Sequence, residues 1–476
     1  TSLTGGNDPL VIIDGVFGDL NMLNAISPAD IENFTVLKDA SETAQYGSRG
    51  ASGVIVVTTV KGKNGVKSMS YDGSFGIESV YKNLDMLSAA EYRSVAQERG
   101  ISILDKGANT NFIEEMQRTG YTQNHRLSFS NGNDDSNYRA SIGVIDQKGI
   151  LKNNSMRNYT AKLDAMQDMF KNKLKIEFGM FGSLKQSRYI NDYQKTFYSA
   201  ASFNPTFPNV VNPETGMWDE NANANEVQNP LGRLSINDRE NNVFINTNAR
   251  ITWSIISDLK LSAFGSYTYN VKENMKYIPS TIKAGLSNRG EAYRGDNKSQ
   301  SLLGNLMLTY KKAFGKHYIN ALGLAEVQRI INTGFGANVH GFSSDDFGYN
   351  NLQAGAVLKW GDNTSYHNNP SLSSFMGRVN YSYADKYIVT LNARTDGSSK
   401  VGANNKWAFF PSASVAWVAS QEGFMKDFEM INNLKLRAGY GLAGNQDAIS
   451  SYNSLSLMSP NGTTTVNGLP VVTMGV

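Results

Sequence analysis

The chain of 476 residues carries 45 Lys and Arg against 42 Asp and Glu, and this net charge of +3 gives no reason to expect a nucleic-acid partner. It has no cysteine, which excludes disulfides, iron–sulfur clusters, thiolate zinc sites and cysteine nucleophiles. No stretch approaches the ~18 consecutive apolar residues of a transmembrane helix, which excludes a helical span. A membrane β-barrel would pass the same test, because its strands alternate apolar and polar residues.

The first 62 residues mix short apolar runs with turn and helix signals, and they predict a small α+β unit. Ser27 and Pro28 predict the start of a short helix, because serine caps a helix N-terminus and proline suits the first helical turn. A helical turn over 39–46 is expected to end at Gly47. Strands rich in apolar residues are predicted at 10–13, 34–37 and 54–59.

From about residue 69, long segments alternate apolar and polar residues with the period of two that is typical of strands. Within one such segment, Val243, Ile245 and Trp253 share one face, whereas Asn246 and Arg250 share the other. Roughly a dozen strands of about ten residues, the length that a tilted membrane strand needs, are predicted. They lie at 126–130, 137–145, 157–165, 173–182, 243–253, 259–269, 302–311, 375–383, 387–394, 412–418 and 434–440.

Aromatic residues end many of these strands, as expected of rings that lie at the two interfaces of a membrane. The alternative is that aromatic residues simply suit strands. The rings are Tyr159, Trp253, Tyr267, Tyr269, Tyr310, Tyr381, Tyr383, Trp407 and Trp417. Tight turns alternate with long polar loops, expected at about 80–122, 185–240, 270–298 and 332–372, which is the outer-membrane pattern.

Two segments resemble one known family. The first comprises Pro9-Leu10-Val11-Ile12-Ile13-Asp14-Gly15, Val36-Leu37-Lys38-Asp39-Ala40, Tyr46-Gly47-Ser48-Arg49-Gly50 and Gly53-Val54-Ile55-Val56-Val57-Thr58-Thr59. In order and spacing these blocks resemble the second half of the plug domain of SusC/RagA-type TonB-dependent outer-membrane transporters. The second segment resembles the mid-barrel signature of the same family and includes Arg394-Thr395-Asp396-Gly397-Ser398 and Gly441-Leu442-Ala443-Gly444-Asn445-Gln446.

The resemblance implies a mainly β fold, a transmembrane antiparallel β-barrel of 22 strands in the family with a small α+β plug in the lumen. Residues 1–62 are then expected to form the C-terminal part of the plug, and 63–476 an incomplete barrel with long extracellular loops. The chain starts with Thr1 and shows no signal peptide, and 448–476 is expected to be a loop. We therefore expect the gene product to be longer at both ends, because unpaired strand edges are not viable in lipid.

The resemblance further implies active import of a large nutrient, a glycan or an oligopeptide, across the outer membrane of a Bacteroidota-like bacterium. The implied partners are a SusD-like surface lipoprotein, the TonB/ExbB/ExbD complex and outer-membrane lipid, and the family arrangement is a dimer of transporter–lipoprotein pairs. One alternative is an outer-membrane binding or adhesion barrel without active transport, which a plug disfavours because an anchor needs no gated lumen. Another is a soluble β-rich enzyme, which would need no detergent for extraction.

No catalytic, cofactor or metal site is predicted, and hydrolase, phosphate-loop and dinucleotide motifs do not occur. His125, His317, His340 and His367 lack metal-ligand spacing and are interpreted as ordinary surface residues. Oxygen-rich segments at 133–135 and 343–346 are interpreted as solvated turns rather than as calcium ligands. We therefore predict a protein that is not an enzyme.

Two sets of candidate functional residues remain. Lys38, Asp39 and Arg49 are candidates for polar contacts in the lumen. Arg49 could pair there with Asp39 and Glu42, because an unpaired buried charge is costly, although a solvated turn is an equal alternative. The second set consists of loop aromatics that could stack on sugar rings or pack against a lid, namely Tyr189, Tyr193, Tyr198, Trp218 and Trp360.

Overall fold

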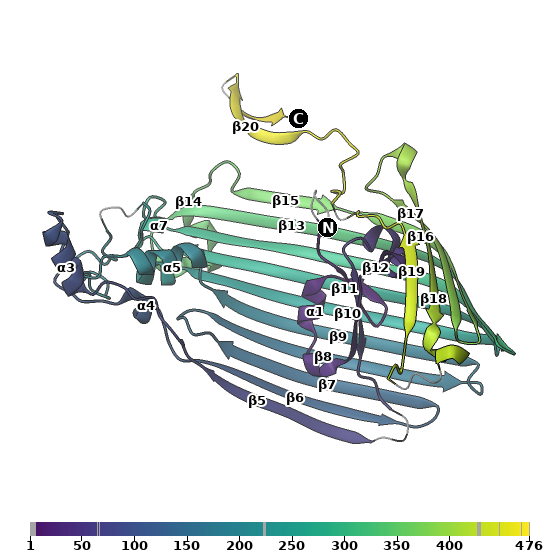
Figure 1. Cartoon of the computed structure of the whole chain (residues 1–476). Helices are drawn as coiled ribbons and strands as arrows, with labels where there is room; N and C mark the ends of the chain where they lie inside the picture. Colours follow the sequence, from purple (N-terminus) through teal and green to yellow (C-terminus); the bar gives the residue numbers. More distant parts are fainter. Residues whose placement is uncertain are drawn as a thin grey trace.

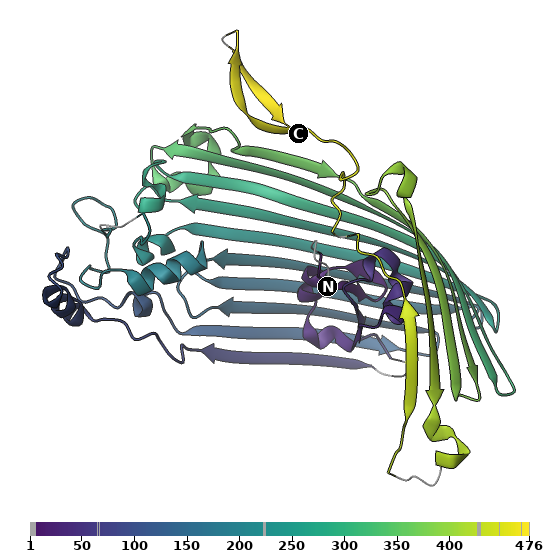
Figure 2. The same cartoon turned by 45° about the horizontal axis from the view of Figure 1, so that its top comes forward.

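The computed structural model describes residues 6–63, 65, 67–221, 225–425, 430–446, 448–467 and 469–475. The fold is mainly β, and a small N-terminal unit lies inside the curve of one long antiparallel sheet (Figures 1 and 2). Among the described residues, no helix is long and apolar enough to cross a membrane.

The N-terminal unit is built on a four-stranded sheet in the order β2-β1-β4-β3, in which β1 and β4 are parallel. Its elements are β1 (Leu10–Ile13), β2 (Val16–Gly18), α1 (Leu20–Ala25), η1 (Pro28–Asp30), β3 (Ile31–Leu37), α2 (Ala40–Thr43), η2 (Ala44–Arg49) and β4 (Val54–Thr59). The α1 helix begins at Asp19, whose side chain accepts a hydrogen bond from the Met22 amide at 3.0 Å. The three strands and the two helical turns predicted here are all present.

The long sheet, called the wall below, runs from β5 to β19, with each strand antiparallel to its neighbours. Its path consists of β5 (Ser68–Glu78), β6 (Gly120–Gly132), β7 (Ser136–Lys148), β8 (Ser155–Met169), β9 (Leu174–Tyr189), β10 (Asn237–Ile256), β11 (Leu259–Ile278), β12 (Glu291–Phe314), β13 (His317–Phe342), β16 (Ser371–Tyr383), β17 (Tyr387–Ser398), β18 (Trp407–Val418) and β19 (Lys435–Gly441). Two more strands, β14 (Gly355–Val357) and β15 (Asn363–Asn368), pair with β13. Every segment predicted as a wall strand falls on one of these strands, although 173–182 and 434–440 begin one residue before β9 and β19 do.

Several wall strands are much longer than the predicted length. The longest, β12 and β13, have 24 and 26 residues. The loop predicted at 270–298 spans only 279–290 in the structure, and the loop predicted to begin at 332 begins at 343. The prediction failed because these segments are rich in polar residues and glycine and so resemble loops in composition, although backbone pairing continues, as between Asn274 and Gly295.

The two ends of the wall differ. Most turns at one end are tight, such as 257–258 and 315–316, whereas 419–434 is longer and includes η6 (Ala419–Gln421) and η7 (Gly423–Met425). The loops at the other end contain α3 (Ala89–Glu98), α4 (Phe112–Glu115), α5 (Tyr193–Ser202), α6 (Pro230–Leu234), α7 (Lys283–Leu286), η3 (Asp345–Asn350), η4 (Leu352–Ala354) and η5 (Ala403–Asn405). A separate hairpin of β20 (Ser459–Val466) and β21 (Leu469–Gly475) replaces the loop predicted at 448–476.

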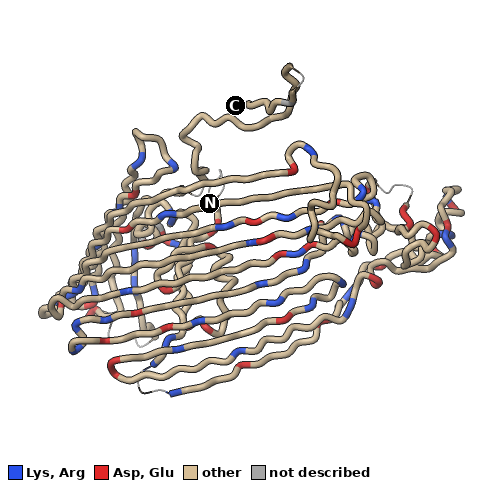
Figure 3. Tube along the Cα trace, turned by 180° about the vertical axis from the view of Figure 1, so that it is seen from behind, with Lys and Arg blue, Asp and Glu red and all other residues tan. Residues whose placement is uncertain are grey.

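The wall is apolar on its outward face and polar on its inward face. Exposed apolar side chains cover the outside, including Leu127, Ile142, Leu163, Phe178, Met180, Ile251, Leu306, Val327, Leu391 and Val415. Buried polar side chains face the N-terminal unit, including Arg126, Ser141, Asn158, Asn246, Ser262, Glu326, Gln328, Arg394 and Asp396. Charged residues are spread along the strands and are frequent toward the loop end (Figure 3). This inverted arrangement is the one that a lipid-facing barrel requires.

Candidate functional site

The contact between the N-terminal unit and the wall joins residues that lie far apart in the sequence. It consists of two clusters of buried ion pairs and an apolar patch between the N-terminal sheet and β9–β12. A large cavity lies next to it, between the N-terminal unit and the wall. Both ion-pair clusters, the apolar patch and the cavity are formed by side chains of the N-terminal unit and of the wall together. A movement of the N-terminal unit would therefore change all of them.

The first cluster, called the latch below, comprises Ser48, Arg49, Glu326, Arg394 and Asp396. The Arg49 guanidinium lies 2.5 Å from Oε1 of Glu326, which also lies 3.2 Å from Nη2 of Arg394. Nε of Arg394 lies 2.7 Å from Oδ1 of Asp396. The amide and hydroxyl of Ser48 donate to Oδ2 of Asp396 at 2.7 and 2.8 Å. Two arginines therefore face two carboxylates, and all four groups are buried.

The η2 segment is kinked at Gly47, which has a φ of +57°. This kink places Ser48 and Arg49 against β13 and β17. A Cβ atom at this position would collide with the Asp396 carboxylate and would lie 2.7 Å from Nε of Arg394. Glycine is therefore required both for the left-handed backbone and for the close approach. The carbonyl of Gln45, on the other side of the kink, accepts a hydrogen bond from Arg394 at 3.1 Å.

Arg49 is the only latch cation that the N-terminal unit supplies among the described residues. Its Nη1 donates to Gln328 at 2.6 Å, and its guanidinium lies 4.2 Å from the ring centroid of Phe17. Burial lowers the pKa of the Arg49 guanidinium, and the Glu326 carboxylate opposes this shift. A buried pair of this kind adds little net stability, but removal of one partner leaves an uncompensated charge.

The second cluster anchors η1 to β6 and β7. The Asp30 carboxylate is ion-paired with Arg126 and lies 4.0 Å from Arg139. The Ser141 hydroxyl donates to the same carboxylate at 3.3 Å, and Arg126 also donates to the Ala29 carbonyl at 3.1 Å. Because β6 and β7 are distant from β13 and β17 along the wall, the N-terminal unit is fixed at two separate places.

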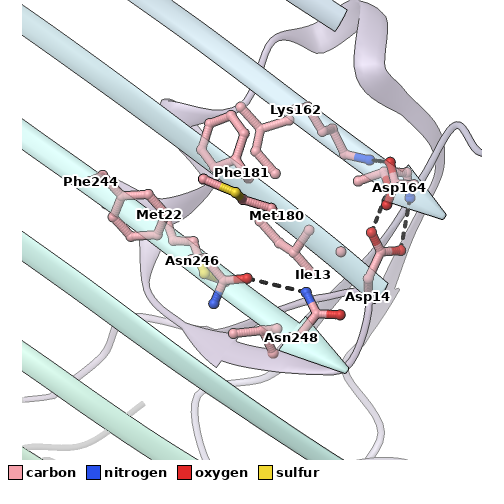
Figure 4. Close-up of a pocket in the computed structure, with 14 residues that line it drawn as sticks. Ile13, Asp14, Met22, Lys162, Asp164, Met180, Phe181, Phe244, Asn246 and Asn248 are labelled. Carbon is pink, nitrogen blue, oxygen red and sulfur yellow. Dashed lines mark hydrogen bonds and ion pairs between the residues drawn. The ribbon is translucent and has the colours of Figure 1, made fainter. Parts of the chain in front are cut away.

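The apolar patch completes the hydrophobic core of the N-terminal unit. Its own buried residues are Val11, Ile13, Val16, Met22, Ile26 and Val57, and the wall adds Phe181, Phe244, Phe264 and Leu303. Figure 4 shows Met22 and Ile13 beside Phe244 and Phe181, with the Lys162–Asp164 ion pair and Asp14 at the polar edge. The Asp14 carboxylate accepts hydrogen bonds from the amide and hydroxyl of Thr59 at 3.1 and 2.5 Å.

The large cavity, called the vestibule below, has a volume of about 720 Å³ and is lined by both polar and apolar residues. Its wall side is mostly uncharged hydroxyl and amide groups, including Thr268, Asn270, Ser299, Ser301, Gln328 and Asn332. Its floor includes Phe17, Asp19 and Arg49, so the latch reaches the vestibule from below. A ligand in the vestibule would therefore contact the same unit that the latch holds.

Comparison with known proteins assigns the family. The TonB-dependent Receptor Plug Domain family matches residues 2–54. TonB-dependent receptor SusC of Bacteroides thetaiotaomicron is 33% identical over 97% of this chain and 48% of its own length. TonB-dependent receptor P3 of Formosa agariphila is 34% identical over 96% of this chain and 46% of its own length. The chain belongs to the SusC-type TonB-dependent receptors. It spans about half the length of the curated relatives that it matches.

Solved structures agree with this fold. The RagAB peptide transporter matches with a TM-score of 0.83 and 21% identity over 100% of this chain and 58% of that chain. The ferric citrate transporter FecA matches with a TM-score of 0.58 and 9% identity over 93% of this chain and 55% of that chain. The N-terminal unit is thus the plug. The chain is a protein of the bacterial outer membrane, and its family consists of transporters rather than enzymes.

Of the three candidate plug residues, only Arg49 lies in the latch. It pairs with Glu326 and not with Asp39 or Glu42, which corrects the suggested pairing. The reason is the kink at Gly47, which directs the next residues to β13 and β17. Asp39 immediately precedes α2, its carbonyl accepts hydrogen bonds from the amides of Glu42 and Thr43, and both Lys38 and Asp39 are exposed.

The five candidate aromatics of this receptor chain do not form one site. Tyr189, Tyr193 and Tyr198 are exposed near the junction of β9 and α5. Trp218 is half-buried against Gly232 of α6. Trp360 is exposed in the loop before β15. The structure thus supports one group of three exposed tyrosines at the loop end.

Two further sequence interpretations can be compared with the structure. His340 is 4% exposed and lies 3.3 Å from Asp362 and 3.6 Å from Glu291, so the interpretation as a surface residue is wrong. The loop that contains Asp362 folds back onto β13, and the sequence did not reveal this. Asp345 accepts hydrogen bonds from Tyr277 and Ser280, and no cluster of three metal-ligating side chains occurs in the described part of the chain.

The loop between β9 and β10, at the loop end of the wall, is expected to become less stable as the pH rises. The Glu220 carboxylate, in the loop before β10, accepts a hydrogen bond from the Asn229 amide at 2.6 Å. Burial raises its pKa to about 7, above its ordinary value of 4.5. Between these two values the folded loop binds more protons than the unfolded loop, so its stability falls as the pH rises through this window and is lowest above pH 7.

Hydrogen exchange of the loop amides at pH 6 and pH 8 measures this effect, and exchange corrected for its intrinsic pH dependence should be faster at pH 8. Glu220→Gln should remove the difference, because the neutral amide stays uncharged at both values. Glu214→Gln, at an exposed position of the same loop, should leave it unchanged. An equal pH response in wild type and Glu220→Gln would contradict the prediction.

Proposed function

We propose that this chain is the gated part of a TonB-dependent importer that moves a large nutrient across the bacterial outer membrane. The observation that supports this proposal best is the latch, in which buried charges of the plug and the wall neutralise each other. A static anchor would be stabilised better by apolar packing, because buried ion pairs often contribute little net stability. Charges that water can rehydrate suit a contact that opens and closes.

The substrate class is a glycan or an oligopeptide, and the vestibule suits either. Its wall of hydroxyl and amide groups offers hydrogen bonds to a polar ligand without demanding a particular charge. A peptide is the cargo of the solved RagAB transporter, which resembles this chain in fold. The exposed tyrosines at the loop end are proposed to contact the substrate or a lid.

The proposed partners are a SusD-like surface lipoprotein over the loop end and the TonB/ExbB/ExbD complex, which supplies energy from the inner membrane. The large loops with helices α3 to α7 form the rim on which such a lid would rest. A dimer of transporter–lipoprotein pairs completes the proposal. The division into a plug over 1–62 and an incomplete barrel over 63–476 also stays a prediction.

An uptake assay in cells that carry the whole receptor tests this function. Fluorescent oligosaccharides and oligopeptides of matched size are offered separately, with and without an uncoupler of the inner-membrane proton gradient. We expect one class to be bound at the surface and taken up only when the gradient is present. Surface binding that is unaffected by the uncoupler, with no uptake of either class, would contradict import and support an adhesion barrel.

A further inference from the structure

A recess lined by basic residues lies on the outer surface of the wall, where β7 to β10 approach the loop end. Four cations line it, Lys148, Arg157, Arg188 and Arg239, and its volume is about 320 Å³. We call it the basic recess. Asp146, Gln186 and Asn241 are among its other lining residues. It is separate from the vestibule and the latch, and it does not depend on the proposed transport.

The alternation of side chains places the basic recess on the outward face. On β10, Arg239 has the same parity as Ile251 and Trp253, which are exposed. The opposite parity includes Arg250, which approaches Gly15 of the plug. On β8, Arg157 likewise shares its face with Tyr159 and Leu163, which are exposed. The cations therefore point toward the membrane side of the wall and not into the lumen.

The strand register sets three of these cations at one height, just beyond the apolar band, and Arg157 lies two residues along β8 from them. Lys148 pairs with Ser155, Ser155 with Arg188, and Arg188 with Arg239, which forms one row across four strands. Toward the tight-turn end, β8 and β9 continue with the exposed side chains of Tyr159 and Leu184. Nζ of Lys148 lies 5.4 Å from the ring centroid of Tyr121. An aromatic and basic level directly above an apolar band corresponds to the headgroup depth of the outer leaflet.

The charges of the basic recess are not balanced by the protein. Asp146 is the only carboxylate among its lining residues, and it is already paired with Arg157 at 2.7 Å. Arg188 lies directly opposite Arg239 on the neighbouring strand, and like charges in this position repel each other. Its Nε is buried, and no acceptor for it occurs within the described residues. A row of cations therefore lies beside lipid, and the buried Nε–H of Arg188 has no acceptor among the described residues. An anion from outside the chain would balance this charge and accept this hydrogen bond.

We propose that the basic recess binds the phosphate of an anionic glycolipid or phospholipid headgroup in the outer leaflet. Arginine suits this role because its planar guanidinium forms paired hydrogen bonds with phosphate oxygens. Arg188 and Arg239 provide two such groups from adjacent strands, and Arg157 and Lys148 border them. The acyl chains would lie on the apolar band below. The bound lipid would act as the counterion that the protein does not supply.

Native mass spectrometry of the whole receptor, extracted from its own outer membrane in mild detergent, tests the proposal. The wild type should retain a phosphate-containing lipid through delipidation. The double variant Arg188→Gln/Arg239→Gln should bind it at least about tenfold more weakly, because each substitution removes a charge-assisted contact. Lys298→Gln is the matched control, since Lys298 is on the outward face of β12 but is paired with Asp296 at 3.4 Å.

Added inorganic phosphate distinguishes a lipid from a free anion. If the site takes lipid, phosphate at millimolar concentration should not displace the adduct, and Arg188→Lys/Arg239→Lys should restore part of it. Lipid retention that is equal in wild type and double variant would overturn the proposal. Saturable binding of inorganic phosphate alone, lost in the double variant while the lipid adduct is unchanged, would also overturn it. Heat-modifiable migration in electrophoresis confirms that each variant is folded.

Discussion

Glu326→Gln is expected to release the plug from the wall and to make the outer membrane permeable to large solutes. Glu326 is 6% exposed and is the common partner of Arg49 and Arg394. Glutamine keeps the shape but leaves two buried guanidinium groups with Asp396 as their one remaining carboxylate in the latch. Loss of one member of a buried ion pair costs about 3–5 kcal/mol. Hydrogen exchange of the plug amides should accelerate, and cells should become sensitive to antibiotics that are too large for porins.

The control is Glu177→Gln, which removes a carboxylate from a partly solvent-exposed pair with Lys175 at 3.4 Å on β9. This pair is expected to contribute little, because solvent screens exposed charges. Arg49→Lys separates charge from geometry. Lysine keeps the positive charge but cannot contact both Gln328 and Glu326 as the guanidinium does. If Glu326→Gln leaves both plug exchange and antibiotic sensitivity at wild-type levels, the latch does not hold the plug.

Phe244→Ala is expected to loosen the plug by a second route that is independent of charge. Phe244 is 5% exposed, and its ring centroid lies 5.8 Å from that of Phe181, in the patch that covers Met22. Truncation of a buried phenylalanine costs about 3–5 kcal/mol, because apolar burial is lost and a cavity remains. Exchange should accelerate most in β1 and α1, which pack on this patch, and less in η2, which the latch still holds.

The matched control for this variant is Ile251→Ala on the same strand. Ile251 lies on the outward face, where other residues of the protein do not cover it. Lipid can therefore fill the space that the smaller side chain leaves. Its effect on plug exchange should be negligible. Equal acceleration in η2 and in β1 with Phe244→Ala would show that the plug responds as one rigid unit and not through two separate attachments.

The wall strands could be predicted from the sequence only where one face meets lipid. In the segment from Val243 to Trp253, apolar and polar residues alternate because one side is covered by hydrocarbon and the other faces the lumen. Toward the loop end the strands become rich in charged and polar residues, as from Asn270 to Lys276 on β11, and such a segment resembles a loop in composition although the strand continues to Ile278. Backbone pairing lengthens these strands, and pairing leaves no periodic trace in a single chain.

The latch shows the same limit at the level of single residues. Arg49 was a candidate because its motif is recognisable, and Arg394 and Asp396 were part of the second motif, although their role was not predicted. Glu326 had no local signal, because no recognised motif surrounds it in β13, and 277 positions separate it from Arg49. The nearby acids Asp39 and Glu42 were plausible partners in sequence, but the kink at Gly47 excluded them.

The sequence by itself thus determined the family, the mainly β fold, the plug strands and the outward apolar faces, because these depend on local periodicity and on ordered motifs. Only the tertiary structure decided which charges meet in the latch, that wall aromatics complete the plug core, and that four cations of β7 to β10 share one recess. Those contacts depend on the register and curvature of the wall. Both are set by pairing between strands, and no single segment of the chain encodes them.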